Sequence, residues 1–246
     1  MLYICIPAYN EAETVGVLLW RIRKVFQEYS RDYEILVYND GSTDATAETL
    51  EPYAEVVPLT VLGGPERVGY ARAVDALCRA VSARTRYPRR DAMITMQADF
   101  TDQPEHLPEL VKRFEGGADL VIAERTLPPA TPQPVRRLRW IARLAVRAAG
   151  APPNVADPFG SLRLYRISLI RDLLKESGDS PIVGGAGWIP NLELLRRAMP
   201  IARRVETVAL EPRYDVRARE SRVRPWTDGL ALFRTRRPRV VSRAQS

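Results

Sequence analysis

The chain has 246 residues, of which 46% are hydrophobic, and it carries a formal net charge of +7. Its length and apolar content suffice for one substantial domain with its own core, whereas two cysteines are too few for a disulfide framework. Arginine-rich positive charge suits a nucleic acid, an anionic membrane surface or a phosphate-bearing substrate. No run approaches the roughly 18 apolar residues of a membrane span, and the start lacks the basic lead of a signal peptide. We therefore expect a soluble, cytoplasmic protein with buried thiols at Cys5 and Cys78.

Strands and helices alternate along the first half of the chain. Short apolar runs predict strands at 2–7, 34–38, 56–62, 92–96 and 118–123. Helices are predicted between them, at 15–29, 44–53, 68–81 and from about 104, the clearest from apolar residues at three-and-four spacing. Asn10, with Glu13 three residues on, fits a capping box at the start of the first helix. This alternation predicts an α/β fold with a Rossmann-like, mostly parallel sheet flanked by helices.

Polar clusters follow three of the predicted strands. They are YNE (9–11), NDGS (39–42) and QAD (97–99). In parallel sheets, ligands bind beyond the carboxyl ends of the strands, so these clusters mark the expected site.

Regular alternation stops after about residue 125, where a proline-rich connection (127–134) begins. The second part, 127–222, is expected to build the other wall of the cleft. Within it, 134–150 combines an arginine face with an apolar face. Such a helix suits the interface of an anionic membrane or, alternatively, packs on the core with its arginines in solvent.

Five motifs in order, IPAYNE, YNDGSTDAT, QAD, DPFGSLRLYR and WIPNLELLRRA, resemble those of family 2 glycosyltransferases with the GT-A fold. The last two, with the later RARESR, resemble the dolichol- or polyprenol-phosphate mannose synthase branch. The resemblance covers roughly residues 2–235. It implies a single GT-A catalytic domain (1–233), with a nucleotide-binding half (1–126) and an acceptor-side half (127–222), followed by a basic tail (234–246).

The resemblance also implies which residues bind the donor. Pro7, Tyr9 and Glu11 would line the nucleotide pocket, and Asp40 would contact the nucleobase. Arginine suits bidentate contact with phosphate, which fits the arginines that the resemblance places near the donor. The expected donor-binding residues are Pro7, Tyr9, Glu11, Asp40, Gln97, Ala98, Arg125, Arg219 and Arg222. The alternatives are a packed Tyr9, a Glu11 that is only a first-turn helix acid, and ordinary solvated arginines.

Asp99 is the strongest single candidate. A divalent ion that bridges the donor phosphates would stabilise the leaving diphosphate, and Mg²⁺ or Mn²⁺ prefers oxygen ligands. Asp99 offers a carboxylate, Gln97 a carbonyl oxygen and Thr101 a hydroxyl, so Asp99 and Gln97 are the expected metal ligands. The resembled branch usually has Asp-Ala-Asp followed by Leu-Gln, and both the first acid and the later glutamine differ here. This departure predicts a weakened metal site, or one in which arginines carry part of the charge; the alternative is a solvated strand-end acid.

No carboxylate base of the kind that many inverting family members use is recognisable, and Asp157 and Glu193 are the remaining candidates for that role. An ionised phosphate acceptor needs no strong base, which favours a polyprenyl phosphate over a sugar hydroxyl. Asp157 would then position the acceptor or the sugar, whereas Glu193 can be an ordinary helical acid. Arg163 resembles the arginine that follows the DxxSGF segment of that branch. The expected catalytic residues are Asp99, Asp157 and Arg163.

We therefore expect an inverting, metal-assisted hexosyltransferase that moves a mannose- or glucose-type sugar from a nucleotide-diphosphate donor, such as GDP-mannose, to a polyprenyl or dolichyl phosphate. Peripheral contact with the cytoplasmic face of the membrane would bring it to that lipid. Two alternatives are a transferase for a soluble acceptor and a non-catalytic nucleotide-sugar-binding module. No nucleic-acid partner is expected, because the arginines are not interleaved with stacking aromatics.

Overall fold

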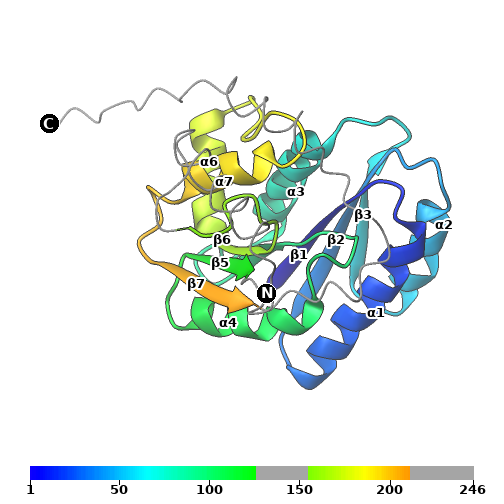
Figure 1. Ribbon diagram of the computed structural model, residues 1–246, viewed down its shortest axis with the longest axis horizontal. Helices are drawn as coiled ribbons and strands as arrows, with labels where there is room; N and C mark the ends of the chain where they lie inside the picture. The colour runs from blue at the N-terminus through cyan, green and yellow to red at the C-terminus, as the bar shows by residue number, and fades with distance from the viewer. Residues whose placement is uncertain (126–154, 211–246) are drawn as a thin grey trace, which may run out of the picture.

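The computed structural model describes residues 1–125 and 155–210. Figure 1 shows a central sheet with helices on both of its faces. Its strands are β1 (Leu2–Ala8), β2 (Tyr33–Asp40), β3 (Leu59–Gly64), β4 (Ala92–Thr95), β5 (Leu120–Arg125), β6 (Arg163–Arg166) and β7 (Val205–Leu210). Their order in the sheet is β3-β2-β1-β4-β6-β5-β7, so strands from both described ranges share one sheet.

The strands of the first half run parallel as far as β4, as the alternation of elements predicts. β1 pairs with β2 on one side and β4 on the other, and β3 pairs with β2. β6 lies between β4 and β5 and is antiparallel to both, whereas β7 is parallel to β5. The sheet is therefore mostly parallel, and the carboxyl ends of β1, β2 and β4 meet at one edge.

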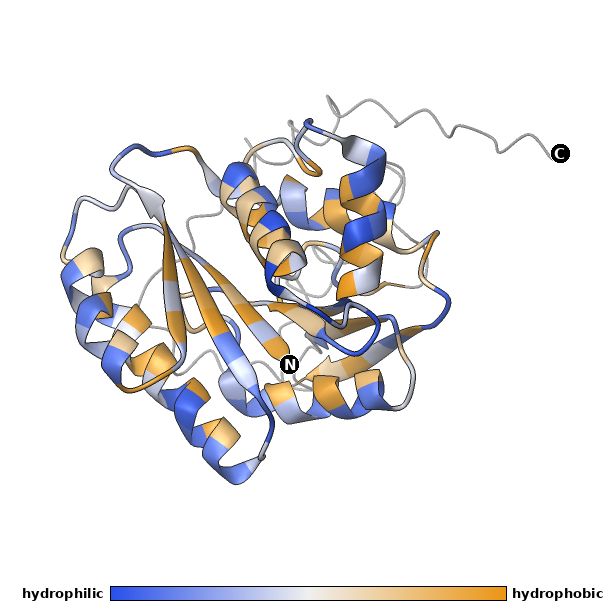
Figure 2. Ribbon diagram, turned by 180° about the vertical axis from the view of Figure 1, so that it is seen from behind, coloured by the Kyte–Doolittle hydropathy of each residue, from blue (hydrophilic) through white to orange (hydrophobic). Residues whose placement is uncertain are grey.

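Two hydrophobic cores form, one on each face of the sheet. Strand β1 shows the two-residue period that produces them: Leu2, Ile4 and Ile6 face one core, and Tyr3 and Cys5 face the other. The first core is covered by the helices α1 (Ala12–Glu28), α2 (Thr46–Leu50) and α4 (Leu107–Glu115). Two 3-10 turns, η1 (Glu51–Glu55) and η2 (Pro104–His106), lie next to α2 and α4 in the chain. The second is covered by α3 (Tyr70–Arg84), α6 (Ile167–Ser177) and α7 (Ile189–Ala198). Figure 2 shows the apolar stripes of these helices against the sheet.

Prolines explain where the observed elements differ from the predicted ones. The helix predicted at 44–53 ends as α2 at Leu50 and continues as a 3-10 turn, because Pro52 has no N–H to donate to an α-helical bond. The strand predicted from 56 begins only after Pro58, at Leu59. Both cysteines are fully buried and free, as predicted.

Candidate functional site

A cavity of about 860 Å³ opens at the edge of the sheet where β1, β2 and β4 end. Because these strands are parallel neighbours, their carboxyl ends bring the three polar clusters together. The cavity is lined by seven of the residues expected to bind donor or metal: Pro7, Tyr9, Glu11, Asp40, Gln97, Ala98 and Asp99. The sequence thus predicts the location of this part of the cavity, while the binding role of each residue stays a prediction.

The remaining walls of the cavity contain residues that sequence reasoning did not single out as site residues. The turn from β3 into α3 contributes Arg67, the first turn of α3 contributes Arg72, and the segment 181–188 contributes Trp188. Glu193, which the sequence offered only as a candidate base or an ordinary helical acid, reaches the cavity from α7. The sequence did contain a signal for Arg67. It lies in the turn GGPERVG, which follows a predicted strand just as the three recognised polar clusters do.

Side chains tie the loop after β1 to the loop after β2. Asn10 has a positive φ of 54°, a conformation that asparagine tolerates better than most residues. Its main-chain N–H donates to Ser42 Oγ at 3.0 Å, and its side-chain oxygen accepts the N–H of Thr43 at 2.8 Å. The predicted capping box of Asn10 and Glu13 is therefore wrong, because Asn10 joins two loops and does not cap the first helix.

Asp44 takes over the capping of α1 from the neighbouring loop. Its Oδ2 accepts the N–H of Ala12 at 3.2 Å, and its Oδ1 accepts the N–H of Thr46 at 3.0 Å. One carboxylate thus serves the first turns of both α1 and α2. Burial opposes ionisation of Asp44, but hydrogen bonds from Thr46 and Ala12 outweigh it and lower the pKa of this carboxyl.

Asp40 shapes the turn between β3 and α3. It is buried, with 4% of its surface exposed, and its Oδ1 accepts the main-chain N–H groups of Val68 at 2.7 Å and Gly69 at 3.0 Å. Arg67 lies 3.8 Å from Asp40 Oδ2, and its guanidinium stacks 3.8 Å above the centre of the Tyr9 ring. The predicted nucleobase end of the cavity therefore carries an aromatic ring and a cation held by a buried carboxylate.

Asp99 lies in a tight turn just after β4. The next residue, Phe100, has a positive φ of 59°, and Asp99 Oδ1 accepts the N–H of Thr101 at 2.9 Å. Asp102, which the sequence interpretation did not single out, is buried and accepts the N–H of Gln97 at 3.0 Å. The carboxylates of Asp99 and Asp102 thus fix the backbone of the turn that carries the predicted metal ligands.

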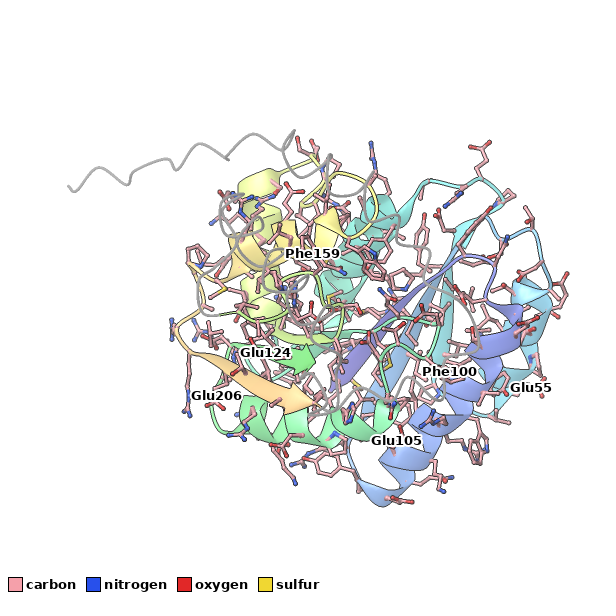
Figure 3. All side chains as sticks on the ribbon, viewed as in Figure 1. Glu55, Phe100, Glu105, Glu124, Phe159 and Glu206 are labelled. Atoms are coloured by element: carbon pink, nitrogen blue, oxygen red, sulfur yellow. The ribbon has the colours of Figure 1, made fainter. Side chains whose placement is uncertain are left out.

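This turn is anchored to the body of the protein on two sides. Asp102 also accepts a hydrogen bond from the hydroxyl of Ser161, in the loop before β6, with 2.5 Å between the two oxygens. On the other side, Arg21 of α1 makes a bidentate pair with Glu105, with bonds of 2.9 and 2.8 Å. Figure 3 labels Glu105 and Phe100, which lie beside α1. The anchoring indicates that the position of Asp99 is fixed by the fold.

A family model for "Glycosyl transferase family 2" matches residues 3–174, well over half of the chain. The chain belongs to glycosyl transferase family 2. The matched range contains the three strand-end clusters that line the cavity.

Curated relatives of this family 2 chain include undecaprenyl-phosphate 4-deoxy-4-formamido-L-arabinose transferases. The one from Pseudomonas aeruginosa (strain LESB58) is 33% identical over 173 residues, which is 70% of this chain and 48% of that protein. The one from Pseudomonas fluorescens (strain Pf0-1) is 35% identical over the same shares. The chain spans about half the length of the curated relatives it matches.

Solved structures confirm the GT-A fold. Glucosyl-3-phosphoglycerate synthase from Mycobacterium tuberculosis, in complex with Mn²⁺, UDP-glucose and phosphoglyceric acid, superposes with a TM-score of 0.61 at 19% identity, covering 95% of this chain and 76% of that one. TarS (residues 1–349) of S. aureus, in complex with UDP-GlcNAc, gives 0.56 at 15% identity, covering 86% and 58%. These likenesses establish the fold of the family 2 chain and not its substrates.

The oxygen donors near the β4 turn suit a divalent ion that the substrate helps to hold. Among the described residues, no three His, Cys, Asp or Glu side chains come together as a metal cluster. Asp99 offers one carboxylate at the cavity, next to the carbonyl-bearing side chain of Gln97. The hydroxyl of Thr101 is buried with no hydrogen-bond partner. Mg²⁺ is commonly held by one or two carboxylates together with substrate phosphates, and this donor set fits that arrangement.

Arg163 and Asp157 do not line the cavity. Arg163 has 1% of its surface exposed, and its guanidinium donates to the main-chain oxygens of Pro158, at 2.6 Å, and Asn191. These contacts support the loop before β6 and α7, and the predicted catalytic role of Arg163 stays a prediction. Asp157 is half-buried beside Gly160, and its predicted role stays untested.

Several predicted features fall where the structure gives no side-chain description. Arg125 ends β5, but its side chain lies outside the described residues. Arg219, Arg222, the predicted amphipathic helix at 134–150 and the basic tail also lie outside the described ranges.

Proposed function

We propose that this family 2 chain is a glycosyltransferase that moves a sugar from a nucleotide-diphosphate donor to a polyprenyl phosphate. The observation that carries the proposal is the single cavity in which the strand-end residues Tyr9, Asp40 and Asp99 meet. Family membership supports the reaction class. The curated relatives, which are named for transfer to undecaprenyl phosphate, support the acceptor class.

The donor is proposed to bind across the ends of β1, β2 and β4. Tyr9 and the Arg67 guanidinium stacked on it provide flat surfaces for a nucleobase. Arg72, in the first turn of α3, is exposed in the same cavity and provides a cation for the diphosphate. Asp99 and Gln97 would hold Mg²⁺ or Mn²⁺, which stabilises the negative charge of a leaving diphosphate when it is bound.

The proposed transfer needs no protein base. An oxygen of the ionised lipid phosphate attacks the anomeric carbon while the bond from that carbon to the donor's phosphate oxygen breaks. The anomeric centre inverts, and the nucleoside diphosphate leaves with the bonding electrons. What the chain's own residues provide is orientation: the anchored β4 turn and the ordered β3–α3 turn fix the donor relative to the acceptor.

The transferred sugar is proposed to be a hexose of the mannose or glucose type. The curated relatives are named for a 4-deoxy-4-formamido-L-arabinose, which makes a modified pentose the competing choice. Both fit a reaction in which the sugar is delivered as a nucleotide conjugate.

Contact with a membrane is proposed to be peripheral. No described helix is both long and apolar enough to cross a bilayer. A lipid-linked acceptor and the net charge of +7 both favour attraction to an anionic membrane surface.

The test is product analysis with the purified full chain, Mn²⁺ and a short polyprenyl phosphate. Radiolabelled GDP-mannose, UDP-glucose and a nucleotide-activated 4-deoxy-4-formamido-L-arabinose are offered in turn. We expect one donor to yield a labelled lipid. Soluble sugars are offered as acceptors in parallel, and transfer to these alone would show that the acceptor is not a lipid. Tight nucleotide binding without any transfer would show that the chain is a binding module.

A further inference from the structure

The segment 181–188 forms a defined wall of the cavity and is held by side chains from two helices. Asp75 of α3 accepts the N–H of Ile182 at 2.8 Å, and Arg197 of α7 donates to the Ile182 carbonyl oxygen at 2.7 Å. Arg79 donates to the Ser180 carbonyl oxygen at 2.8 Å and pairs with Asp75 at 2.9 Å. The start of the wall is therefore fixed against both helices.

Glu193 holds the next part of this wall from inside the cavity. Its Oε2 accepts the N–H of Gly184 at 2.6 Å, and both residues line the cavity. Gly185 has a φ of +85°, and a Cβ there would come within 2.8 Å of Ile189. Glycine is thus required where the wall turns back toward α7, and Trp188 follows at the cavity lining.

One oxygen of Glu193 is left for a ligand. Among the described residues, the hydrogen bonds of the Glu193 carboxylate involve Oε2 alone, which leaves Oε1 without a protein donor. A carboxylate that is held by a main-chain amide and still has acceptor capacity suits hydroxyl donors. The Trp188 ring, which lines the same cavity, suits the apolar C–H face of a sugar ring. Lipid phosphate is a poor match for this carboxylate because both are anionic.

We infer that Glu193 and Trp188 form the subsite for the transferred sugar, in which Glu193 accepts hydrogen bonds from sugar hydroxyls and Trp188 packs against the ring. This inference rests on the proposed donor class. It names the residues that contact the sugar part of the donor and not its nucleotide part. It gives Glu193 a substrate-contacting role, which is distinct from that of an ordinary helical acid.

The experiment compares binding of each nucleotide sugar with binding of the bare nucleotide. Calorimetry with Mn²⁺ measures Kd for UDP-glucose against UDP and for GDP-mannose against GDP, on the full chain and on its variants. For the preferred base, Glu193→Ala is expected to raise the Kd of the nucleotide sugar by at least about tenfold, the range of a lost charge-assisted hydrogen bond. The Kd of the bare nucleotide should stay within about twofold. Trp188→Ala should behave likewise, and Glu28→Ala, an exposed acid of α1, should change neither value.

Glu193→Gln separates sugar contact from support of the wall. Its carbonyl oxygen still accepts the Gly184 N–H, so hydrogen exchange at Gly184 should stay slow, while the neutral amide still weakens nucleotide-sugar binding several-fold. The inference is overturned if Glu193→Gln binds the nucleotide sugar like wild type while Glu193→Ala loses both binding and Gly184 protection. Equal loss for sugar-bearing and bare nucleotides overturns it as well. If wild type binds nucleotide sugars but glycosylates no polyprenyl phosphate, the lipid acceptor fails and the sugar subsite stands.

Discussion

Single carboxylates around the cavity differ in what they contact. Asp40 and Asp102 are buried and accept main-chain amides, so they hold loops in place. Asp99 is half-buried and lines the cavity, and the Asp102–Gln97 bond fixes the turn that carries it. The sequence interpretation identified Asp99 and Asp40 because strand-end acids are recognisable. It missed Asp102 because a carboxylate that bonds to the backbone of its own turn leaves no pattern in the sequence.

The first prediction concerns the metal ligands. Asp99→Asn should lower transferase activity on the order of 100-fold, because the amide removes the charged metal ligand from the cavity. Gln97→Asp should retain activity and reach half-maximal rate at a lower Mn²⁺ concentration, since it restores a second carboxylate. Rates measured across a Mn²⁺ titration check both variants, with Asp172→Asn, an exposed acid of α6, as the control. Full activity of Asp99→Asn would rule out the metal role.

At the level of elements, side chains from the β1 and β2 loops organise the start of the helices. The capping box predicted at Asn10 and Glu13 follows a sound local rule, but a neighbouring loop supplies the cap instead. Local rules did predict the parallel strands, because each buried strand is a compact apolar run. They did not predict β6, because its four residues gain their stability from pairing with β4 and β5, which lie far away in the sequence.

The second prediction tests the shared cap of α1 and α2. Asp44→Ala should lower the free energy of unfolding by about 1 kcal/mol, the usual effect of losing a side-chain cap. Asp44→Asn should restore most of it, because asparagine caps about as well. Chemical denaturation at pH 7 checks both variants.

The pH dependence of this effect has a definite sign. The pKa of Asp44 is lower in the folded protein, so its contribution is fully present above the unfolded pKa and is lost as pH falls through the folded value. The difference in stability between wild type and Asp44→Ala should therefore shrink in the acid range. A difference that stays constant down to pH 2 would show that the charge of Asp44 does not contribute.

For the molecule as a whole, the sequence predicted one half of the cavity better than the other. The first half places its site residues at strand ends, where the order of elements alone determines their location. Glu193 and Trp188 reach the cavity only through the packing of α7 against α3 and the glycine turn before it. Such long-range packing has no local sequence signal, which is why Glu193 could be interpreted as an ordinary helical acid.

The last prediction concerns attraction to membranes. Because the chain has a net charge of +7, the purified protein should sediment with phosphatidylserine-containing vesicles and not with pure phosphatidylcholine vesicles. Raising the salt to about 1 M should release it, since the Debye length then falls to about 3 Å. Addition of a polyprenyl phosphate to the neutral vesicles should restore binding if the cavity engages the lipid headgroup. Salt-resistant binding to neutral vesicles without that lipid would instead indicate apolar insertion, and electrostatic attraction would then not be the source of membrane contact.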